Sequence, residues 1–399
     1  DSATDINIFI NTEKASQIII GILLSIFVAF SIGAFIQWIS RLILSFNFED
    51  KSLYLNSIIG SLSFSSIINF ILIKGIKGSP YSSETYDFLG GLTINNFIDN
   101  NILQFWMISL FIWYILSIIL IKIFRIDIYK IIIALGTFSL ALAFAGNDLV
   151  NFIGVPIAAL ESYNGWVASG VNANEFSMSI LADKVQPKPI YLFVSGLIMV
   201  VTIWYSSKAK NVVKTSLDLS NQNIVDEKFN SNIIGVFLVN IGRGLNNIFI
   251  KLAPKSLLNQ IEKSFNTNNV EVFSSSEDRP SFDKLRASLN LVIAAILISL
   301  ATSYKLPLST TYVTFMVAMG TSLSDRAWSK ESAVYRVSGV VNVIGGWFLT
   351  AFSAFCVCGL IVFLIHIGKT VAIIALIIVS AAIIYRNHVL FKKKGEIKI

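Results

Sequence analysis

Long apolar runs alternate with short polar connections along most of this chain. A transmembrane helix needs about 20 predominantly apolar residues, and solid runs such as Ile115–Ile121 lack the alternation of a membrane β-strand. The pattern therefore predicts an all-α polytopic membrane protein. We expect about eight transmembrane helices, with 306–324 as a ninth crossing or a re-entrant segment. They lie at 17–46, 52–74, 102–124, 129–147, 189–206, 285–304, 332–366 and 369–387.

Polar stretches divide these runs into five parts. A polar N-terminal segment precedes the first transmembrane region, and a loop rich in Asn, Ser, Asp and Glu separates it from the second, which a basic tail follows. The loop holds apolar residues at spacings of three and four, which predict an amphipathic helix. We expect it to lie on the cytoplasmic membrane surface or to pack against the transmembrane body. The parts are 1–16, 17–206, 207–283, 284–387 and 388–399, and the stripe is Ile234, Phe237, Leu238, Ile241, Leu245, Ile248, Phe249 and Leu252.

Composition supports the membrane assignment. Hydrophobic residues make up 54% of the chain and charged residues 14%, against about 25% charged residues in soluble domains. The net charge of +7 comes from basic residues scattered through loops and the C-terminal tail, so we expect a lipid bilayer and no nucleic acid as partner. Their distribution predicts a multi-pass protein of the cell (inner) membrane, with the 207–283 loop and the C-terminus in the cytoplasm.

The first candidate site is the motif Gly146-Asn147-Asp148-Leu149-Val150-Asn151, which interrupts an apolar run. An ionisable side chain near a bilayer centre costs about 2.5–3.5 kcal/mol, so it usually faces a cavity, an ion or a partner. Gly, Asn and Asp disfavour helix interiors, and Pro156 follows. We therefore expect the helix to break here. Asp148 and Asn147 would supply oxygen ligands for a small cation, and Asn151 could donate to an anion; a kink around a structural Asp148 is the alternative.

The second candidate site is the motif Leu306-Pro307-Leu308-Ser309-Thr310-Thr311-Tyr312. Proline before a turn of hydroxyl residues is typical of a helix N-terminus. Free N–H groups and the positive end of the helix dipole would then face an anion. Serine and threonine hydroxyls also donate hydrogen bonds to carbonyls of their own helix, and a purely structural role of this kind is the alternative to anion binding. Together the two motifs favour cation-coupled anion symport at the meeting point of two discontinuous helices.

At these motifs the chain resembles the inorganic phosphate transporter (PiT) family, which carries Gly-Asn-Asp-Val-x-Asn and Pro-Val-Ser-Thr-Thr-His signatures in each of two inverted repeats. The 135–170 and 285–355 regions are similar, and the loops look like those of Bacteroidetes-type members. The resemblance implies a homodimeric, non-enzymatic transporter that imports phosphate with sodium. It implies phosphate ligation by Asn147, Asp148, Asn151, Ser309, Thr310 and Thr311, and sodium ligation by Asp148 and Asn147.

The chain departs from the family pattern at two points. Tyr312 replaces the usual histidine, and each signature occurs once, so we expect the N-terminal repeat, with about half the substrate site, to be absent from these residues. The alternatives are a proton-coupled carrier of phosphate, a carrier of sulfate or another oxyanion, and a non-transporting scaffold or receptor derived from a half-transporter. A membrane enzyme is not expected, because the spans hold no metal cluster and no nucleophile beside a base.

Overall fold

The computed structural model describes residues 12–49, 51–77, 84–181, 187–206, 230–266, 283–304, 306, 308–326 and 332–396. Helices dominate these residues, and a hairpin of two short strands, β1 (Thr85–Tyr86) and β2 (Leu92–Thr93), is a small addition to the predicted all-α fold. The helices are α2 (Thr12–Leu44), α3 (Leu53–Lys77), η2 (Asp87–Leu89), α4 (Ile94–Asn100), α5 (Ile102–Lys122), α6 (Ile128–Ser169), η3 (Met178–Leu181), α7 (Pro189–Tyr205), α9 (Ile233–Leu252), α10 (Lys255–Ser264), α11 (Lys284–Ser303), α12 (Thr310–Ser324) and α13 (Ser332–Glu396).

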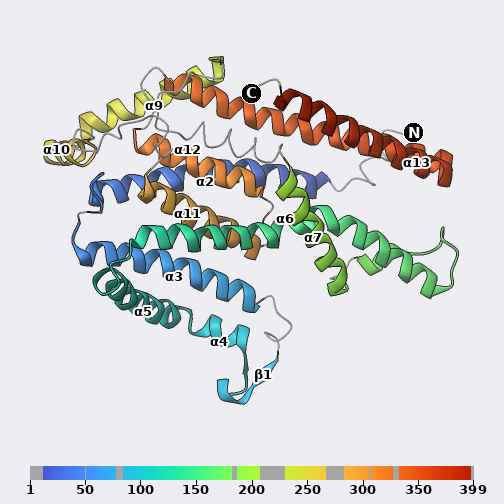
Figure 1. The fold of residues 1–399 in the computed structure, drawn as a ribbon, viewed down its shortest axis with the longest axis horizontal. Helices are drawn as coiled ribbons and strands as arrows, with labels where there is room; N and C mark the ends of the chain where they lie inside the picture. Colours follow the sequence, from blue (N-terminus) through green and yellow to red (C-terminus); the bar gives the residue numbers. More distant parts are fainter. Residues whose placement is uncertain are drawn as a thin grey trace. The chain divides into compact units, whose positions relative to one another are not determined.

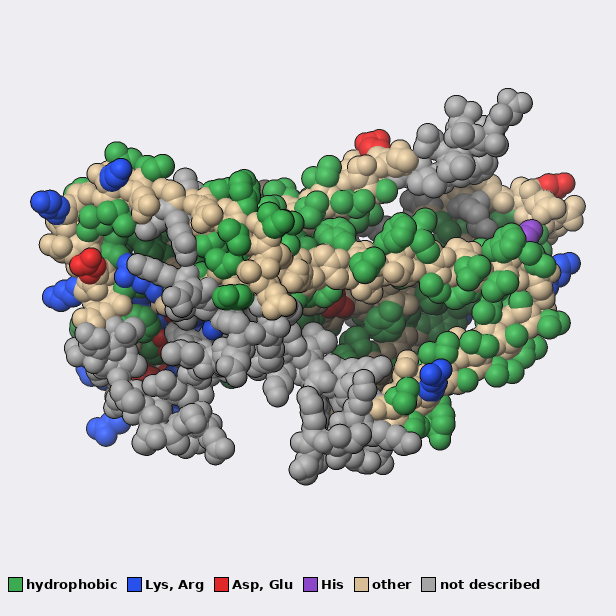
Figure 2. Space-filling model, turned by 90° about the horizontal axis from the view of Figure 1, so that it is seen from above, with side chains coloured by type: hydrophobic (Ala, Val, Ile, Leu, Met, Phe, Trp, Pro, Cys, Tyr) green, Lys and Arg blue, Asp and Glu red, His purple; other side chains and the backbone are tan. Residues whose placement is uncertain are grey.

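Five helices within the described ranges are long and apolar enough to cross a membrane. Hydrophobic side chains predominate on the face shown in Figure 2, and charged side chains are sparse there. This confirms the prediction of an all-α, multi-pass membrane protein, while the total of about eight spans stays a prediction. The five candidate spans are Ala15–Leu44 of α2, Ile102–Lys122 of α5, Ile128–Ala145 of α6, Lys284–Thr302 of α11 and Ala333–Asn387 of α13.

The chain forms two compact units, Asp1–Val225 with Ile248–Ser329 and Asp226–Asn247 with Lys330–Ile399. In the first unit α12 packs mainly on α2, α11 on α6, and α3 on α5. Figure 1 shows these helices running alongside one another, with α11 among α2, α6 and α12. Serine hydroxyls join α3 to α5: Ser61 donates to the Leu110 carbonyl over 2.7 Å, and Ser65 to Ser109 over 2.9 Å. Small polar residues of this kind let membrane helices approach closely.

Two glycines bring the backbones of α2 and α12 into close contact. A Cβ atom at Gly33 would lie 2.9 Å from the Val317 carbonyl oxygen, and one at Gly320 would collide with the Phe30 carbonyl. Ten of the 15 residues of α12 are buried. A 15-residue helix is about 22 Å long, shorter than the roughly 30 Å of a hydrocarbon core. The structure therefore favours a short helix enclosed by protein over a ninth complete crossing at 306–324.

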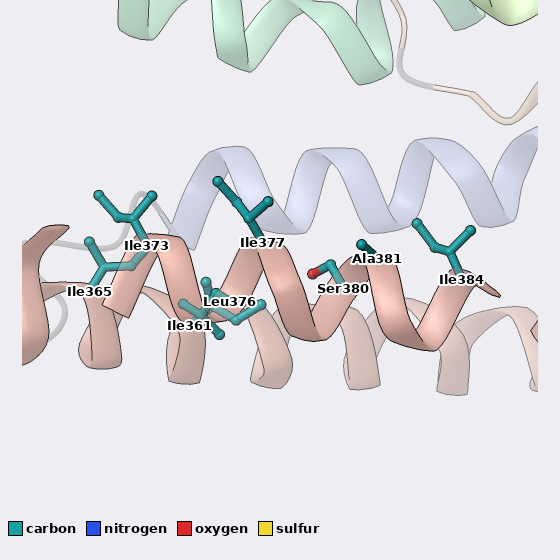
Figure 3. A pocket seen from close by; sticks show the side chains of 8 residues that line it. All are labelled: Ile361, Ile365, Ile373, Leu376, Ile377, Ser380, Ala381 and Ile384. Atoms are coloured by element: carbon teal, nitrogen blue, oxygen red, sulfur yellow. The ribbon is translucent and has the colours of Figure 1, made fainter. Parts of the chain in front are cut away.

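In the second unit, α13 is two helical arms separated at Lys369, whose φ of 46° and ψ of −132° are not helical. Figure 1 shows the two arms side by side, and Figure 3 shows Ile365 and Ile373 lining one apolar groove from either side of the turn. This confirms the predicted division between an apolar run that ends at residue 366 and one that begins at 369.

The predicted helix break around Asp148 is wrong. Helix α6 continues from Ile128 to Ser169, through the motif and past Pro156. Glycine and Asp cost a helix about 1 kcal/mol or less each, whereas each backbone group left unpaired in lipid costs several. Continuing the helix is therefore the less costly solution, even with a proline inside it.

Candidate functional site

Helix α6 carries Asp148 close to its midpoint. The helix begins after Asp127, whose carboxylate caps it by accepting a 3.0 Å hydrogen bond from the Tyr129 N–H. Apolar residues stand on both sides of Asp148 in the sequence, among them Phe144 and Ile153. The carboxylate is thus an isolated charge within a largely apolar stretch of the helix.

Helix α12 begins at the second motif, as predicted. Ser309 is the N-cap residue, with extended backbone angles of −101° and 120°, and its hydroxyl accepts a 3.4 Å hydrogen bond from the Tyr312 N–H. Such a cap satisfies one of the N–H groups that a helix start leaves unpaired. Thr310 is the first helical residue, so its side chain stands at the positive end of the helix dipole.

The two motifs meet through one side-chain contact. The Thr310 hydroxyl lies 2.9 Å from Oδ1 and 3.0 Å from Oδ2 of Asp148, so it donates to the carboxylate across 162 residues of sequence. Thr310 is 3% exposed, and Asp148 is half-buried. The predicted proximity of the motifs is confirmed. A carboxylate beside the first residue of another helix is favourable, because the positive end of the helix dipole attracts an anion.

The other predicted residues are neighbours of Asp148 and Thr310 in the sequence, and the structure describes some of their side chains. Asn151 lies three positions after Asp148 on α6, which places the two residues on neighbouring parts of the helix surface, and its side chain is exposed. Thr311 is also exposed, beside Thr310. The side chain of Asn147 lies outside the described part of the structure. No role in binding follows from these positions alone.

The chemistry available at the site is that of oxygen ligands and hydroxyl donors. A carboxylate suits a hard cation, and hydroxyls at a helix N-terminus suit an oxyanion. Among the described residues, no group of three or more His, Cys, Asp or Glu side chains could hold a metal ion. A cation at Asp148 would therefore be held by one carboxylate with neutral oxygens.

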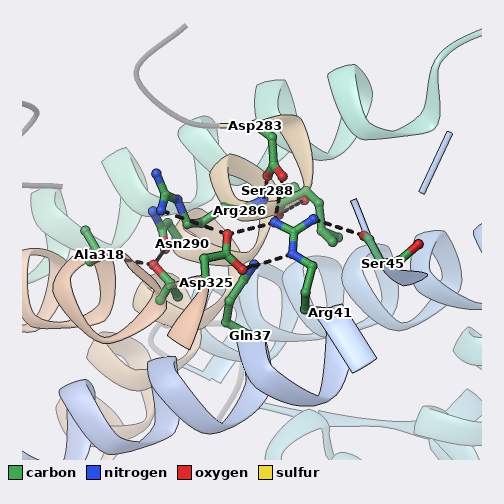
Figure 4. A network of polar contacts seen from close by, with 11 residues as sticks. Gln37, Arg41, Ser45, Asp283, Arg286, Ser288, Asn290, Ala318 and Asp325 are labelled. Atoms are coloured by element: carbon green, nitrogen blue, oxygen red, sulfur yellow. Dashed lines mark hydrogen bonds and ion pairs between the residues drawn. The ribbon is translucent and has the colours of Figure 1, made fainter. Parts of the chain in front are cut away.

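A second polar cluster, which the sequence analysis missed, lies buried where α2, α11 and α12 meet. The Arg41 guanidinium binds Asp325 in bidentate fashion, with 2.9 Å from Nε to Oδ1 and 2.7 Å from Nη2 to Oδ2. Nη2 also lies 2.6 Å from Asp283, and Gln37 donates to Asp325 over 2.7 Å. The side chains of Arg41 and Asp325 are fully buried. Figure 4 shows these residues converging from the three helices.

The cluster lies at the C-terminal end of α12, whereas Thr310 lies at its N-terminal end. It is also next to the start of α6, whereas Asp148 lies near the middle of that helix. Asp283 also caps α11 by accepting a 2.8 Å hydrogen bond from the Arg286 N–H. Lys284 forms 2.7 Å ion pairs with Glu49 and Asp127, just before α6. The signal for this cluster in the sequence was a charged or amide residue at the end of each apolar run, namely Gln37 and Arg41 in one and Asp283 and Asp325 beside two others.

Comparison of the chain with known protein families, with curated proteins and with solved structures finds no match. The contact between Asp148 and Thr310 is therefore the main indication of function.

Proposed function

We propose that this chain belongs to a secondary transporter that imports inorganic phosphate together with sodium. The observation that carries the proposal is the hydrogen bond between Thr310 and Asp148. It joins a carboxylate, which suits a cation, to a hydroxyl at a helix N-terminus, which suits an anion. Phosphate, rather than another tetrahedral oxyanion, is chosen on the resemblance of the two motifs to the family. Asn147, Asn151, Ser309 and Thr311 complete the proposed ligand set.

The contact suggests how the two ligands are coupled. Without ligands, Asp148 holds the Thr310 hydroxyl and occupies the anion-favouring end of α12. Sodium bound at Asp148 neutralises the carboxylate and releases the hydroxyl, which then donates to phosphate. Each ligand thereby raises the affinity of the site for the other, and linkage requires the two factors to be equal.

Uptake of radiolabelled phosphate into proteoliposomes of the full-length protein tests the proposal, with sodium and proton gradients imposed separately. We expect uptake to follow the sodium gradient and to resist competition by sulfate. In Asp148→Asn the amide keeps the shape but loses the charge that binds the cation, so uptake should no longer follow sodium. Uptake driven by protons, or blocked equally by sulfate, would support the alternative carriers.

A complete lack of phosphate binding would favour a scaffold or receptor instead. Sodium-dependent binding of labelled phosphate to the detergent-solubilised protein distinguishes this outcome from a failed reconstitution. If Asp148→Asn still concentrates phosphate against its gradient, Asp148 is structural and coupling occurs elsewhere.

A further inference from the structure

Helix α9 carries a row of large apolar side chains that are exposed. Ile234, Phe237 and Ile241 follow one another at helical spacing, with Phe237 61% exposed, and Ile248 and Leu252 continue the row, with Leu252 80% exposed. An apolar row of this length is unfavourable in water. Some apolar or interfacial environment therefore covers it in the working protein.

The row is not the face by which α9 contacts α13. Asn232 caps the helix by accepting a 2.6 Å hydrogen bond from Gly235, and its backbone N–H donates to Ser338 of α13 over 3.0 Å. A Cβ atom at Gly235 would collide with the Ser338 hydroxyl. Each residue turns a helix by about 100°, so Gly235 lies about 120° around the helix from Ile241. The contact with α13 thus leaves the apolar row uncovered.

Helix α10, which directly follows α9, packs against the end of the candidate span in α2. In α10, Ile261 is buried where the helix packs on α2, and Ser264 donates a 3.0 Å hydrogen bond to the Leu42 carbonyl. The candidate span of α2 ends at Leu44. Helix α10, and with it the C-terminal end of α9, therefore lies where α2 leaves the apolar layer.

Charge on the same segment complements an anionic surface. Lys251, Lys255 and Lys263 have exposed side chains, against the single exposed acid Glu262 between residues 248 and 265. Lysines beside an apolar row extend their charged ends toward lipid phosphates while their stems stay in contact with apolar surface. Basic residues at a membrane surface each contribute about a fivefold preference for anionic lipid.

We propose that α9 lies in the interface of an anionic lipid leaflet, with its apolar row in the acyl boundary and these lysines on lipid phosphates. The geometry is that of an interfacial amphipathic helix. The Asn232–Ser338 contact precedes the helix, and α10, which follows it, lies at the end of the α2 span. The proposal is independent of the transported ion.

Spin labels on two faces of α9 test it in the full chain reconstituted into vesicles. In a background of Cys356→Ala and Cys358→Ala, Ile241→Cys labels the apolar row, and Asn247→Cys is the matched control about 120° around the same helix. The relaxation agents are oxygen, which concentrates in acyl chains, and a nickel chelate, which stays in water. We expect high oxygen and low nickel accessibility at 241, and the reverse at 247.

The vesicle composition tests the charge argument. Nickel accessibility at 241 should be lower in mixed phosphatidylcholine–phosphatidylglycerol vesicles than in phosphatidylcholine alone. Changing Lys251, Lys255 and Lys263 together to Gln should remove that difference, since three such residues account for roughly a hundredfold in partitioning. High nickel accessibility at 241 in both lipids would overturn the proposal. Low accessibility to both agents would overturn it too, because a protein partner would then cover the row.

Discussion

At the scale of single residues, the Asp148–Thr310 contact and the Arg41–Asp325 contact differ in character. Asp148 and Thr310 form one hydrogen-bonded pair between two helices, and the half-buried carboxylate can still accept other ligands. Arg41 and Asp325 are fully buried and saturate one another in bidentate geometry, with Asp283 and Gln37 adding further bonds. The first contact is suited to exchange for ligands, whereas the second is suited to holding three helices together.

Replacing Thr310 by Val tests the first contact. The change keeps the volume of the side chain and removes the hydroxyl that would donate to phosphate, so phosphate affinity should fall about ten- to a hundredfold, or roughly 1.5–3 kcal/mol. Titration of labelled phosphate at fixed sodium measures it. Thr314→Val is the control, since that hydroxyl donates to the Thr310 and Thr311 carbonyls of its own helix. Equal affinities in both variants would remove Thr310 from the site.

Replacing Arg41 by Gln tests the second contact. Asp325 would keep its buried charge without its main partner, and breaking a buried pair from one side costs about 3–5 kcal/mol. Thermal unfolding in detergent should show a large loss of stability. Lys284→Gln serves as the comparison, because its ion pairs are partly exposed and such pairs contribute about 0–1 kcal/mol. Similar losses in the two variants would contradict the structural role assigned to Arg41.

At the scale of elements, α12 is held to α2 along its length by the glycine contacts in its middle and by Asp325 after its C-terminal end. Gly320→Ala would push the two backbones apart, because the new Cβ atom would meet the Phe30 carbonyl. Overpacking of this kind costs about 1–3 kcal/mol. Gly346→Ala in α13, where nothing lies within 4 Å, should be neutral or slightly stabilising. Unfolding curves of the two variants give the comparison directly.

Element boundaries could be predicted from the sequence where a local signal decides them. The length of the apolar runs predicted the long helices, the Ser309 cap marked the start of α12, and the Lys369 turn falls at the first residue of the run predicted at 369–387. The course of α6 through Asp148 could not be predicted, because a backbone surrounded by apolar groups favours helix more strongly than local preferences oppose it. The contact between Asp148 and Thr310 was expected because both motifs were assigned to one site. The charged residues at the ends of the apolar runs, in contrast, did not indicate which acids would bind Arg41.

At the scale of the whole molecule, α13 gives a test of membrane topology. Its two arms meet at Lys369, so the turn should face the opposite side of the membrane from the C-terminal tail. In a background of Cys356→Ala and Cys358→Ala, an impermeant maleimide should label Lys369→Cys in intact cells. Asn387→Cys, near the end of the apolar run, should react after permeabilisation. Labelling of both positions from one side would show that α13 does not cross twice.

The buried ion pair also has a consequence for how the chain is made. Arg41 and Asp325 are 284 residues apart, and ribosomes add about 5–20 residues each second, so on the order of 15–60 s pass between their syntheses. During that interval the guanidinium has no Asp325 to bind, and it must stay among lipid headgroups or within the insertion machinery. Nascent chains that stop before α12 therefore carry a guanidinium that lacks its bidentate partner, and Asp283 is the first of its two acids to become available.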